Sequence, residues 1–459
     1  MPIAMTDAFD AELIRRYDIR APRYTSYPTA DRFHPGFGPG DCQRALRTRA
    51  DAPLSLYVHI PFCPSPCFYC GCHREITRQP GPIQDYLEAL EREIALKAAL
   101  LEQSGPVVQV HFGGGSPTFL ASDQLARIMD MLRAHFDFAP KLEIGIEADP
   151  RNLDAEKVRM LGQMGFNRLS VGVQDFDPIV QASINRRQSH AETEMVVRAA
   201  RTAGFDSVSL DLIYGLPHQH PERFEITLDQ VLALQPDRVA LYSYAHLPDR
   251  FKAQRQIPTS ALPDPTLKLR LLGLAVERLT EADYVHIGMD HFAQPNDPLA
   301  EALTQGTLHR NFQGYSTHGG CDLIGLGVSA ISQIGHCYAQ NTKELLDYQT
   351  SLNQGTLPIR RGITLTREDS LRQEVIQALM CQGRVCYHDI RVRHGVEFAA
   401  YFAEELLRLE TAAADGLVRL TPRALEVTPR GRYMLRAIAL PFDAYLNRNG
   451  ESPRHSRLI

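Results

Sequence analysis

Short β-branched runs alternate with amphipathic stretches through the middle of the chain, and this alternation restricts the possible folds more than any other feature. The runs begin with "LSLYVHI" and "VVQVHF" and occupy residues 54–60, 107–112, 142–148, 168–173, 207–214 and 238–244. The stretches between them, such as "HAETEMVVRAARTAG", carry apolar residues at helical spacing. Strands and helices alternating in this way predict an α/β fold of βα units around a parallel sheet. The run "YVHIGM" at 284–289 is expected to extend that sheet.

The carboxyl ends of the predicted strands carry polar or glycine-rich motifs. Units of this kind form a full or partial barrel or an open doubly wound sheet, and in both cases the chemistry lies at the carboxyl ends of the strands. Successive runs lead into a cysteine cluster, "GGGSP", "EADP", "GVQDF" and "DLIYGLP". Because consecutive strands deliver polar groups to one edge, we expect an active site there.

The two ends of the chain differ from this central region. Residues 1–52 include "IRAPRYTSYPTADRFHPGFGPGD", which is rich in proline, glycine and tyrosine and predicts an irregular arm or lid. Residues 53–320 are expected to form the (β/α) barrel. Residues 321–459 are expected to form a connecting segment and a mainly helical, winged-helix-like domain with a hairpin around Thr421 and Pro422. No basic cluster supports DNA binding by this domain, so we interpret it as a packing or lid domain.

The charge balance argues against a nucleic-acid partner. The 459 residues include 49 basic and 54 acidic side chains, a net charge of −5, so an anionic substrate would be held by local arginines. The amino-terminal segment lacks the apolar core of a signal peptide, and no run of about 18 apolar residues predicts a membrane span. We therefore expect a cytoplasmic protein, a monomer that binds neither nucleic acid nor membrane. In a reducing compartment, closely spaced cysteines favour metal or redox chemistry over disulfides.

Four cysteines, Cys63, Cys67, Cys70 and Cys72, lie close together in "CPSPCFYCGC" after the first predicted strand. A structural zinc site usually divides its ligands between two distant pairs, whereas one loop often supplies the cysteines of an iron–sulfur cluster. The spacing C-x3-C-x2-C supplies three ligands and leaves one iron of a cuboidal cluster open. S-adenosylmethionine (SAM) can chelate that iron, and one electron from the cluster then releases a 5′-deoxyadenosyl radical. Four protein thiolates would leave no open iron, so one cysteine must stay off the metal.

Other residues at the same edge are suited to bind that cofactor, although each also has a structural interpretation. The glycines of "GGGSP" (113–117) would allow close approach of the methionine group, or they simply form a turn. Glu147 ends an apolar strand, where its carboxylate needs a partner, either SAM or a structural ion pair. Gln174, Arg186 and Asp211 also lie at or just beyond strand ends.

Longer motifs connect the chain with a known family. "YVHIPFCPSPCFYCGC" resembles the radical SAM superfamily, whose defining motif is C-x3-C-x2-C. Together with "PRYTSYPTADRF", "HFGGGSPTFL", "GFNRLSVGVQDF", "LHRNFQGYSTHGGCDLIGLGVSAIS" and the ending "SRLI", it resembles the oxygen-independent coproporphyrinogen III oxidases over nearly the whole chain. The resemblance implies a partial or full barrel of the radical SAM type. It also implies conversion of two propionates of coproporphyrinogen III to vinyl groups, giving protoporphyrinogen IX and carbon dioxide in heme biosynthesis.

The resemblance further implies one 4Fe–4S cluster and two SAM molecules. It selects Cys63, Cys67 and Cys70 as iron ligands and leaves Cys72 nearer the substrate or the second SAM. The cluster-bound SAM is expected to contact Tyr57, Gly114, Glu147 and Ile331. The second SAM is expected to contact Tyr69, Gly115, Ser116, Gln174, Arg186, Asp211 and Ala245. Ser116 stands where the family often has threonine, and the candidates for catalysis are Glu147 and Cys72.

The substrate carries four carboxylates, so we expect cations in its pocket. Arg20, Arg23 and Arg32 on the arm, with Arg310, are candidates from charge complementarity, and solvated surface positions are the alternative. The implied electron donor is a reduced protein such as flavodoxin or ferredoxin. A heme-trafficking relative without oxidase activity and a non-catalytic iron–sulfur sensor are the competing functions. The trafficking relatives generally lack the cysteine at position 72 and the motif "PRYTSYPT", and this chain has both.

Overall fold

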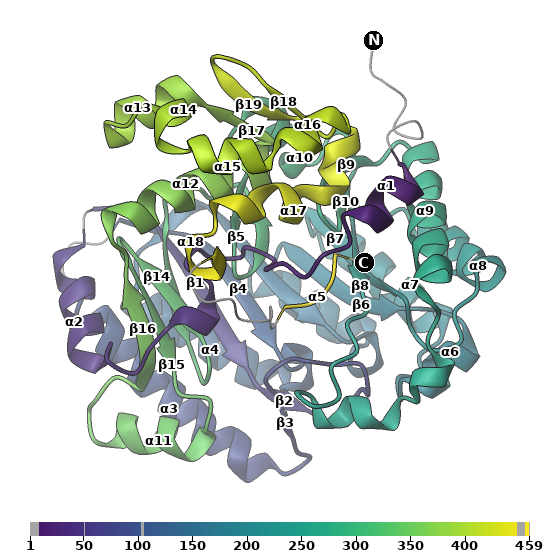
Figure 1. Cartoon of the computed structure of the whole chain (residues 1–459). Helices are drawn as coiled ribbons and strands as arrows, with labels where there is room; N and C mark the ends of the chain where they lie inside the picture. The colour runs from purple at the N-terminus through teal and green to yellow at the C-terminus, as the bar shows by residue number, and fades with distance from the viewer. Residues whose placement is uncertain (1–8, 50, 102–104, 448–454, 459) are drawn as a thin grey trace.

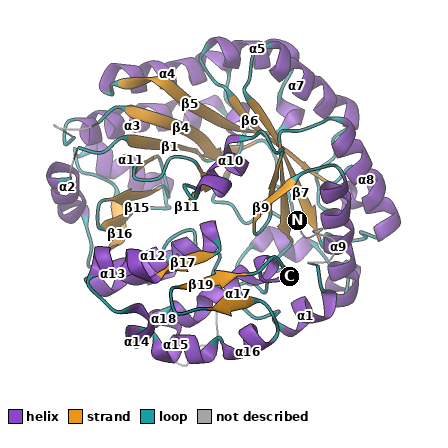
Figure 2. Cartoon of the chain, turned by 90° about the horizontal axis from the view of Figure 1, so that it is seen from above, coloured by secondary structure: helices purple, strands orange, loops and turns teal. Residues whose placement is uncertain are grey.

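One mixed sheet organises the molecule (Figure 1). The computed structural model describes residues 9–49, 51–101, 105–447 and 455–458, so the first eight residues of the predicted arm lie outside the described residues. The main sheet has twelve strands in the order β16-β15-β14-β13-β1-β4-β5-β6-β7-β8-β10-β9. It curves strongly without closing, and within the described part of the chain β16 and β9 form its two edges (Figure 2). The predicted barrel is therefore a partial one.

All six predicted strands form. They are β1 (Leu54–Ile60), β4 (Val107–Gly114), β5 (Phe138–Ala148), β6 (Arg168–Gln174), β7 (Ser207–Tyr214) and β8 (Arg238–Ser243). Each of them pairs in parallel with the next. The run at 284–289 contributes β9 (Val285–Gly288), which joins β8 through the antiparallel β10 (His291–Ala293).

Amphipathic helices cover the outer side of the parallel strands, as Figure 2 shows for α4, α5, α7 and α8. In α4, Leu125, Ile128, Met129 and Leu132 repeat at helical spacing and are fully buried in the main core. The helices of this region are α3 (Pro80–Ala98), α4 (Ser122–His135), α5 (Ala155–Gln163), α6 (Pro178–Ser183), α7 (His190–Thr202), α8 (Pro221–Ala233), α9 (Pro265–Glu281) and α10 (Pro298–Gln305). Helices α3 to α8 are the crossovers that parallel pairing from β1 to β8 requires.

The dipeptide Asp-Pro marks the start of three of these helices. In α6, α9 and α10, the aspartate side chain accepts a hydrogen bond from a backbone N–H of the first turn, and proline occupies the first helical position. Proline suits that position because its missing N–H would have no partner there. The same dipeptide at 149–150 opens the 3-10 turn η4 (Pro150–Asn152) directly after β5. Asp149 is thereby oriented at the carboxyl edge of the sheet.

The chain after residue 320 also contributes to the main sheet. β13 (Asp322–Leu326) pairs in parallel with β1, and the antiparallel β14 (Ile331–Ile334), β15 (Cys337–Asn341) and β16 (Ile359–Thr364) extend it. A fully buried ion pair anchors β13: Lys97 Nζ lies 2.7 Å from Glu93 Oε1 and donates to the carbonyl of Gly325 at 2.6 Å. Glu93 in turn accepts from the Gly327 amide at 2.7 Å. Helix α3 therefore holds β13 against β1.

The arm and the end of the chain meet across the open side of the partial barrel. Arg20 and Arg457 form an antiparallel bridge, and the Ala21 amide donates to the carbonyl of Ser456 at 3.3 Å. The buried guanidinium of Arg436 donates to carbonyls on both segments. The arm contains α1 (Ala11–Arg16), η2 (Ala30–Arg32) and α2 (Pro39–Thr48). These contacts make the arm a structured strap across the opening.

The carboxyl-terminal region combines short helices with a three-stranded sheet, at the top of Figure 1. The sheet consists of β17 (Arg384–Cys386), β19 (Ala424–Val427) and β18 (Val418–Leu420), and β18 and β19 form the expected hairpin. Its helices are α12 (Arg367–Gln382), α13 (Tyr387–His394), α14 (Phe398–Tyr401), α15 (Ala403–Arg408), α16 (Glu410–Ala414), α17 (Leu435–Ala439) and α18 (Ala444–Asn447). Helix α11 (Leu345–Asn353) connects β15 to β16 and packs against α3 at the bottom of Figure 1. No helix among the described residues is both long and apolar enough to cross a membrane.

Lys97→Met should destabilise the protein by about 3 kcal/mol or more, because it leaves the buried Glu93 carboxylate without its cation. The double variant Glu93→Gln/Lys97→Met removes both charges and should recover a large part of that loss. Chemical denaturation of the two variants beside the wild type measures the difference. If the single variant is no less stable than the double variant, the ion pair does not anchor β13.

Candidate active site

The cysteine loop lies between β2 (Phe62–Cys63) and β3 (Glu75–Ile76), directly beyond β1. Neighbouring segments fix its shape. The Phe68 amide donates to the Ile184 carbonyl at 2.9 Å, and Asn185 Nδ2 donates to the Pro66 carbonyl at 2.7 Å. Arg74 donates to the carbonyls of Cys67, Cys70 and Cys72. The loop is therefore held by its backbone, which leaves the thiols available to ligate metal.

The thiols fit a cuboidal cluster better than a single ion. Burial and the neighbouring thiols raise the pKa of Cys63 to about 12, whereas a hydrogen bond from Cys72 lowers the pKa of Cys70 to about 6. Among the described residues, no three His, Cys, Asp or Glu side chains are arranged to hold one metal ion. A 4Fe–4S cluster binds each thiolate through a different iron, so its ligands need not converge on one point. Three free thiols on one loop, with cationic side chains beside Cys67, match that group.

The glycine run packs tightly against the cysteine loop and β5. The amide of Gly114 donates to Glu147 Oε2 at 3.1 Å. The amides of Gly115 and Ser116 donate to the carbonyls of Ile60 and Phe62 at 2.8 and 2.9 Å. A Cβ at Gly115 would lie 2.5 Å from the Pro61 carbonyl oxygen, so only glycine fits. The run thus serves packing as well as access, since three of its amides already have partners within the protein.

Glu147 lies beside the expected Tyr57 and two histidines, His59 and His111, that sequence reasoning did not identify. Burial raises its pKa, but the hydrogen bonds from His111 and the Gly114 amide outweigh that effect and hold the pKa below its usual value. His111 stacks on the Tyr57 ring, with centroids 6.2 Å apart. The Tyr57 hydroxyl lies 3.2 Å from His59 Nδ1, and burial lowers the pKa of His59 to about 4. His59 is therefore neutral, and its Nδ1 can accept the tyrosine hydroxyl.

Asp211 is a second carboxyl in the same cavity but has a different environment. A cavity of about 160 Å³ is lined by both Glu147 and Asp211. Burial, followed by the charge of Glu147, raises the pKa of Asp211 to about 7. The Ser170 hydroxyl lies 3.1 Å from both of its carboxyl oxygens and donates a hydrogen bond to them. Strongly shifted carboxyls that line a cavity are characteristic of binding and catalytic sites.

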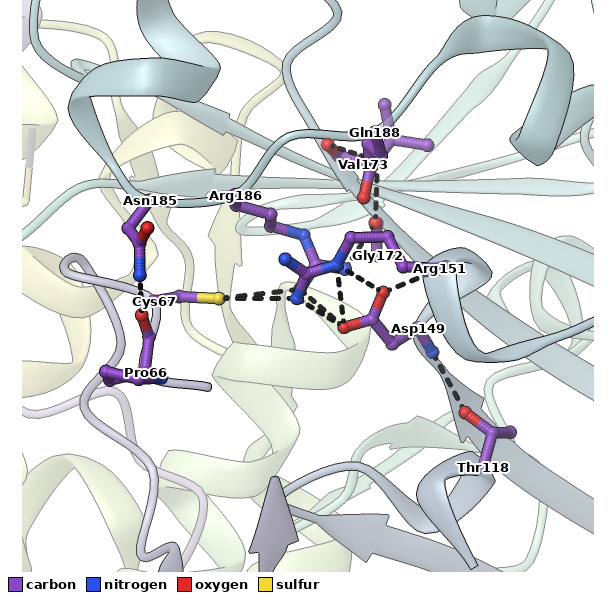
Figure 3. Close-up of polar contacts among 10 residues, drawn as sticks. All are labelled: Pro66, Cys67, Thr118, Asp149, Arg151, Gly172, Val173, Asn185, Arg186 and Gln188. Atoms are coloured by element: carbon purple, nitrogen blue, oxygen red, sulfur yellow. Dashed lines mark hydrogen bonds and ion pairs between the residues drawn. The ribbon is translucent and has the colours of Figure 1, made fainter. Parts of the chain in front are cut away.

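Most residues expected at the second SAM lie around one corner of the site. Gln254 Nε2 donates to the carbonyls of both Tyr69 and Ala245, at 2.9 and 3.2 Å, and so brings these distant residues together. Gln174 ends β6 in the left-handed region, with φ of 67°. Arg186 Nη1 lies 3.7 Å from Cys67 Sγ and so connects this corner to the cysteine loop (Figure 3).

Two further expected residues differ in how close they lie to the rest of the site. Ser116 is 5% exposed, and its hydroxyl is buried without a hydrogen-bond partner among the described residues. Ile331 begins β14 and packs with its backbone against Gly325, the residue that pairs with Tyr57 on β1. Ile331 is therefore separated from Tyr57 by one strand. Among the described residues, no hydrogen bond joins Ile331 to Glu147.

The structure brings together two of the four candidate substrate arginines. Arg310 is 2% exposed, stacks on Tyr315 at 4.6 Å, and donates through Nε to the carbonyl of Arg23 at 3.4 Å. Arg23 forms an ion pair with Asp290 and lies over the Tyr242 ring. Tyr242 and Tyr315 line the cavity that contains the two carboxyls.

The other two candidates have partners elsewhere. Arg20 is exposed and bridges to Arg457, and Arg32 pairs with Asp31 at 3.4 Å.

Sequence reasoning missed His59, His111, Asp149 and Arg151. A signal existed for His59, because it follows Tyr57 by two residues on a strand and so shares its face. Another existed for Asp149, because "DP" after a strand marks a cap. His111 had no local signal, since its proximity to Glu147 depends on the register between β4 and β5.

Comparison with known proteins identifies both parts of the chain. Residues 57–231 match the radical SAM superfamily, and residues 365–434 match the HemN C-terminal domain. The oxygen-independent coproporphyrinogen III oxidase of Pseudomonas aeruginosa is 51% identical over 96% of this chain and 97% of its own length. The enzyme of the same name from Escherichia coli K12 is 47% identical over 98% of each chain.

A solved structure agrees with this assignment. The coproporphyrinogen III oxidase HemN from Escherichia coli, described as a radical SAM enzyme, superposes with a TM-score of 0.91 over 95% of this chain and 99% of its own. These findings confirm both the fold class and the resemblance inferred from the motifs. The chain therefore belongs to the oxygen-independent coproporphyrinogen III oxidases of the radical SAM superfamily.

Proposed function

We propose that the protein oxidatively decarboxylates two propionate side chains of coproporphyrinogen III without oxygen, giving protoporphyrinogen IX for heme biosynthesis. The full-length similarity to oxidases of that name carries this proposal. The chemistry also requires a cluster loop and a SAM pocket at one edge of a sheet. The three predicted cysteine ligands and the cavity with Glu147 and Asp211 support that requirement.

The superfamily implies a 4Fe–4S cluster and SAM, which when bound supply a 5′-deoxyadenosyl radical that removes a hydrogen atom from a propionate. Cys63, Cys67 and Cys70 would hold the cluster, and Cys72 would remain off the metal. Tyr57 and His59 form a wall beside Glu147 and would exclude water from the reacting groups. The wall is uncharged, because His59 is neutral and burial raises the pKa of Tyr57 well above its usual value. Loss of carbon dioxide, with transfer of one electron from the substrate radical to an electron acceptor, would then leave the vinyl group.

We further propose that two SAM molecules bind, one at the cluster and one beside it. Glu147, with Tyr57, Gly114 and Ile331, would serve the first. Asp211, with Tyr69, Gly115, Ser116, Gln174, Arg186 and Ala245, would serve the second. Two features support separate sites: the carboxyls have opposite pKa shifts, and Ser116 presents a buried hydroxyl without a partner among the described residues. The remaining proposals are a reduced flavodoxin or ferredoxin as electron donor, and a monomeric, cytoplasmic enzyme.

The substrate carboxylates would meet Arg310 and Arg23. Arg310 is buried, and its Nη1 has no hydrogen-bond partner among the described residues. A buried guanidinium that lacks acceptors is unfavourable unless a ligand supplies them. A propionate carboxylate would supply two acceptors in the plane of the guanidinium. The arm that carries Arg23 would then close over the substrate as a lid.

Anaerobic binding of SAM to the cluster-loaded protein tests the number of sites. The wild type should bind two molecules per chain. Glu147→Ala and Asp211→Ala should each lose one molecule and keep normal iron, since each removes a charge-assisted hydrogen bond worth about 1.5–3 kcal/mol. Ser209→Ala, which changes the same face of β7 at the far end of the cavity, should still bind two. A wild-type stoichiometry of one would contradict the second site.

Without SAM, the Asp211→Asn variant should become more stable than the wild type as pH rises. The folded pKa of about 7 lies above the usual value, so the folded state retains the proton more strongly, and the resulting stability is lost as pH rises through 7. The asparagine side chain cannot titrate, so the variant lacks this pH-dependent loss. Its free energy of unfolding relative to that of the wild type should therefore increase by roughly 1–3 kcal/mol between pH 5 and pH 8. Anaerobic chemical denaturation measures it, with the exposed Asp206→Asn as control. Parallel pH profiles for Asp211→Asn and the wild type would show that Asp211 is not strained by burial.

An anaerobic assay with cluster, SAM, reductant and coproporphyrinogen III tests the reaction itself. The wild type should form protoporphyrinogen IX and carbon dioxide. Arg310→Gln should raise KM for the porphyrinogen about ten- to hundredfold through loss of a charged hydrogen bond. Arg310→Lys should give a KM between those of the wild type and Arg310→Gln, because lysine keeps the positive charge but lacks the planar guanidinium group. The exposed Arg44→Gln should match the wild type. No product from the wild type would refute the proposed reaction, and an unchanged KM in Arg310→Gln would refute only the carboxylate site.

A further inference from the structure

Two guanidinium groups approach one thiol of the cysteine loop. Cys67 is buried, and Arg151 Nη2 and Arg186 Nη1 lie 3.8 and 3.7 Å from its Sγ (Figure 3). Both contacts are within hydrogen-bond range for sulfur. The arginines reach the thiol from separate elements, η4 after β5 and the loop after α6. Contacts to the backbone already anchor the loop. The two cations beside this predicted iron ligand are therefore not needed to hold the loop in place.

Asp149 holds both cations in place. Its carboxylate accepts from the Arg151 amide at 3.1 Å, from Arg151 Nε at 2.9 Å and from Arg151 Nη2 at 2.6 Å. The same carboxylate accepts from Arg186 Nη1 at 3.2 Å, and Arg186 Nη2 donates to the Gly172 carbonyl at 2.8 Å. The cluster of three charged groups is buried: the side chains of Asp149 and Arg186 are each 8% exposed, and that of Arg151 is 19% exposed. One carboxylate between two guanidiniums leaves an excess positive charge facing the sulfur.

The two arginines are not equivalent. Arg186 has a further role in the proposed function, because it faces the corner assigned to the second SAM. Arg151 has no such assignment. Its side chain contacts Asp149 and the sulfur of Cys67. The position of Arg151 follows from the Asp-Pro cap at the end of β5, which turns the chain so that residue 151 points back toward the cysteine loop.

We propose that Arg151, oriented by Asp149, raises the reduction potential of the cluster through its contact with Cys67. The inference rests on the proposed cluster ligation. Reduction adds one electron to the cluster and its thiolates, with no bond made or broken, and nearby positive charge stabilises the product of that step. Hydrogen bonds to ligand sulfur and buried charge are recognised determinants of iron–sulfur potentials. Arg151 is therefore a positioning residue that makes the first electron transfer easier.

A redox titration of the full-length protein with reconstituted cluster, followed by EPR without SAM, tests this role. Omitting SAM separates the effect from cofactor binding. Arg151→Gln should make the equilibrium constant for reduction of the cluster about tenfold smaller. For a one-electron couple this lowers the midpoint potential by about 59 mV. Arg151→Lys should lie between Arg151→Gln and the wild type. Arg78→Gln removes a contact to the Pro64 carbonyl in the same loop, but not one to sulfur, and should leave the midpoint unchanged.

Asp149→Asn should shift the midpoint potential in the opposite direction. It keeps the capping oxygen but removes the negative charge between the two guanidiniums, so the midpoint should rise. A network that only stiffened the loop would not shift the potential in opposite directions in the two variants. An unchanged midpoint in Arg151→Gln at full iron content would overturn the proposal, and so would loss of iron from both variants. If the wild type itself gave no 4Fe–4S signal, the proposed function would fail instead.

Discussion

Parallel pairing from β13 through β8 is the constraint on which the rest of the structure depends. A tight turn cannot connect parallel strands, so each connection crosses the outside of the sheet as a helix, and every loop leaving a carboxyl end stays on the same edge. That geometry places the cysteine loop, the glycine run and η4 side by side although they are separated in sequence. Register then sets the side-chain contacts: Tyr57 pairs with His111, and His111 pairs with Gly145. A Cβ at Gly145 would lie 2.8 Å from His111 Nδ1, so glycine there makes room for the imidazole.

The electrostatics of the cavity favour binding over stability. Glu147 keeps its charge because His111 and the Gly114 amide stabilise the carboxylate. Asp211 lies beside a like charge and accepts a hydrogen bond from the Ser170 hydroxyl. One nitrogen of Arg310 has no acceptor among the described residues. Groups left in this state destabilise a ligand-free protein, and they are common where a ligand later completes the interactions.

The central strands were predictable because apolar periodicity is a local property, and the parallel architecture followed from their alternation with helices. The short strands after residue 320 that extend the main sheet were not recognised, because runs of four to six residues resemble loops and their placement involves distant parts of the chain, such as Lys97, which contacts Gly325. The cysteines proposed as ligands stood out through their spacing. The contacts of His111 and Arg151 depend on register and on a cap, so no local pattern revealed them. The glycine run was expected to allow close approach of the cofactor, and its packing role was not foreseen: the amides of Gly114, Gly115 and Ser116 have partners within the protein.

The junction between the arm and the last described segment has a consequence for how the protein is made. Ala21 and Arg20 leave the ribosome early, whereas Ser456 and Arg457 emerge hundreds of residues later. The βα units between them can pack as they emerge, since each helix folds back onto a strand already synthesised. The contacts of the strap with Ser456 and Arg457, in contrast, form only when translation reaches those residues. The junction that secures the arm across the open face of the partial barrel is therefore among the last parts of the molecule to form.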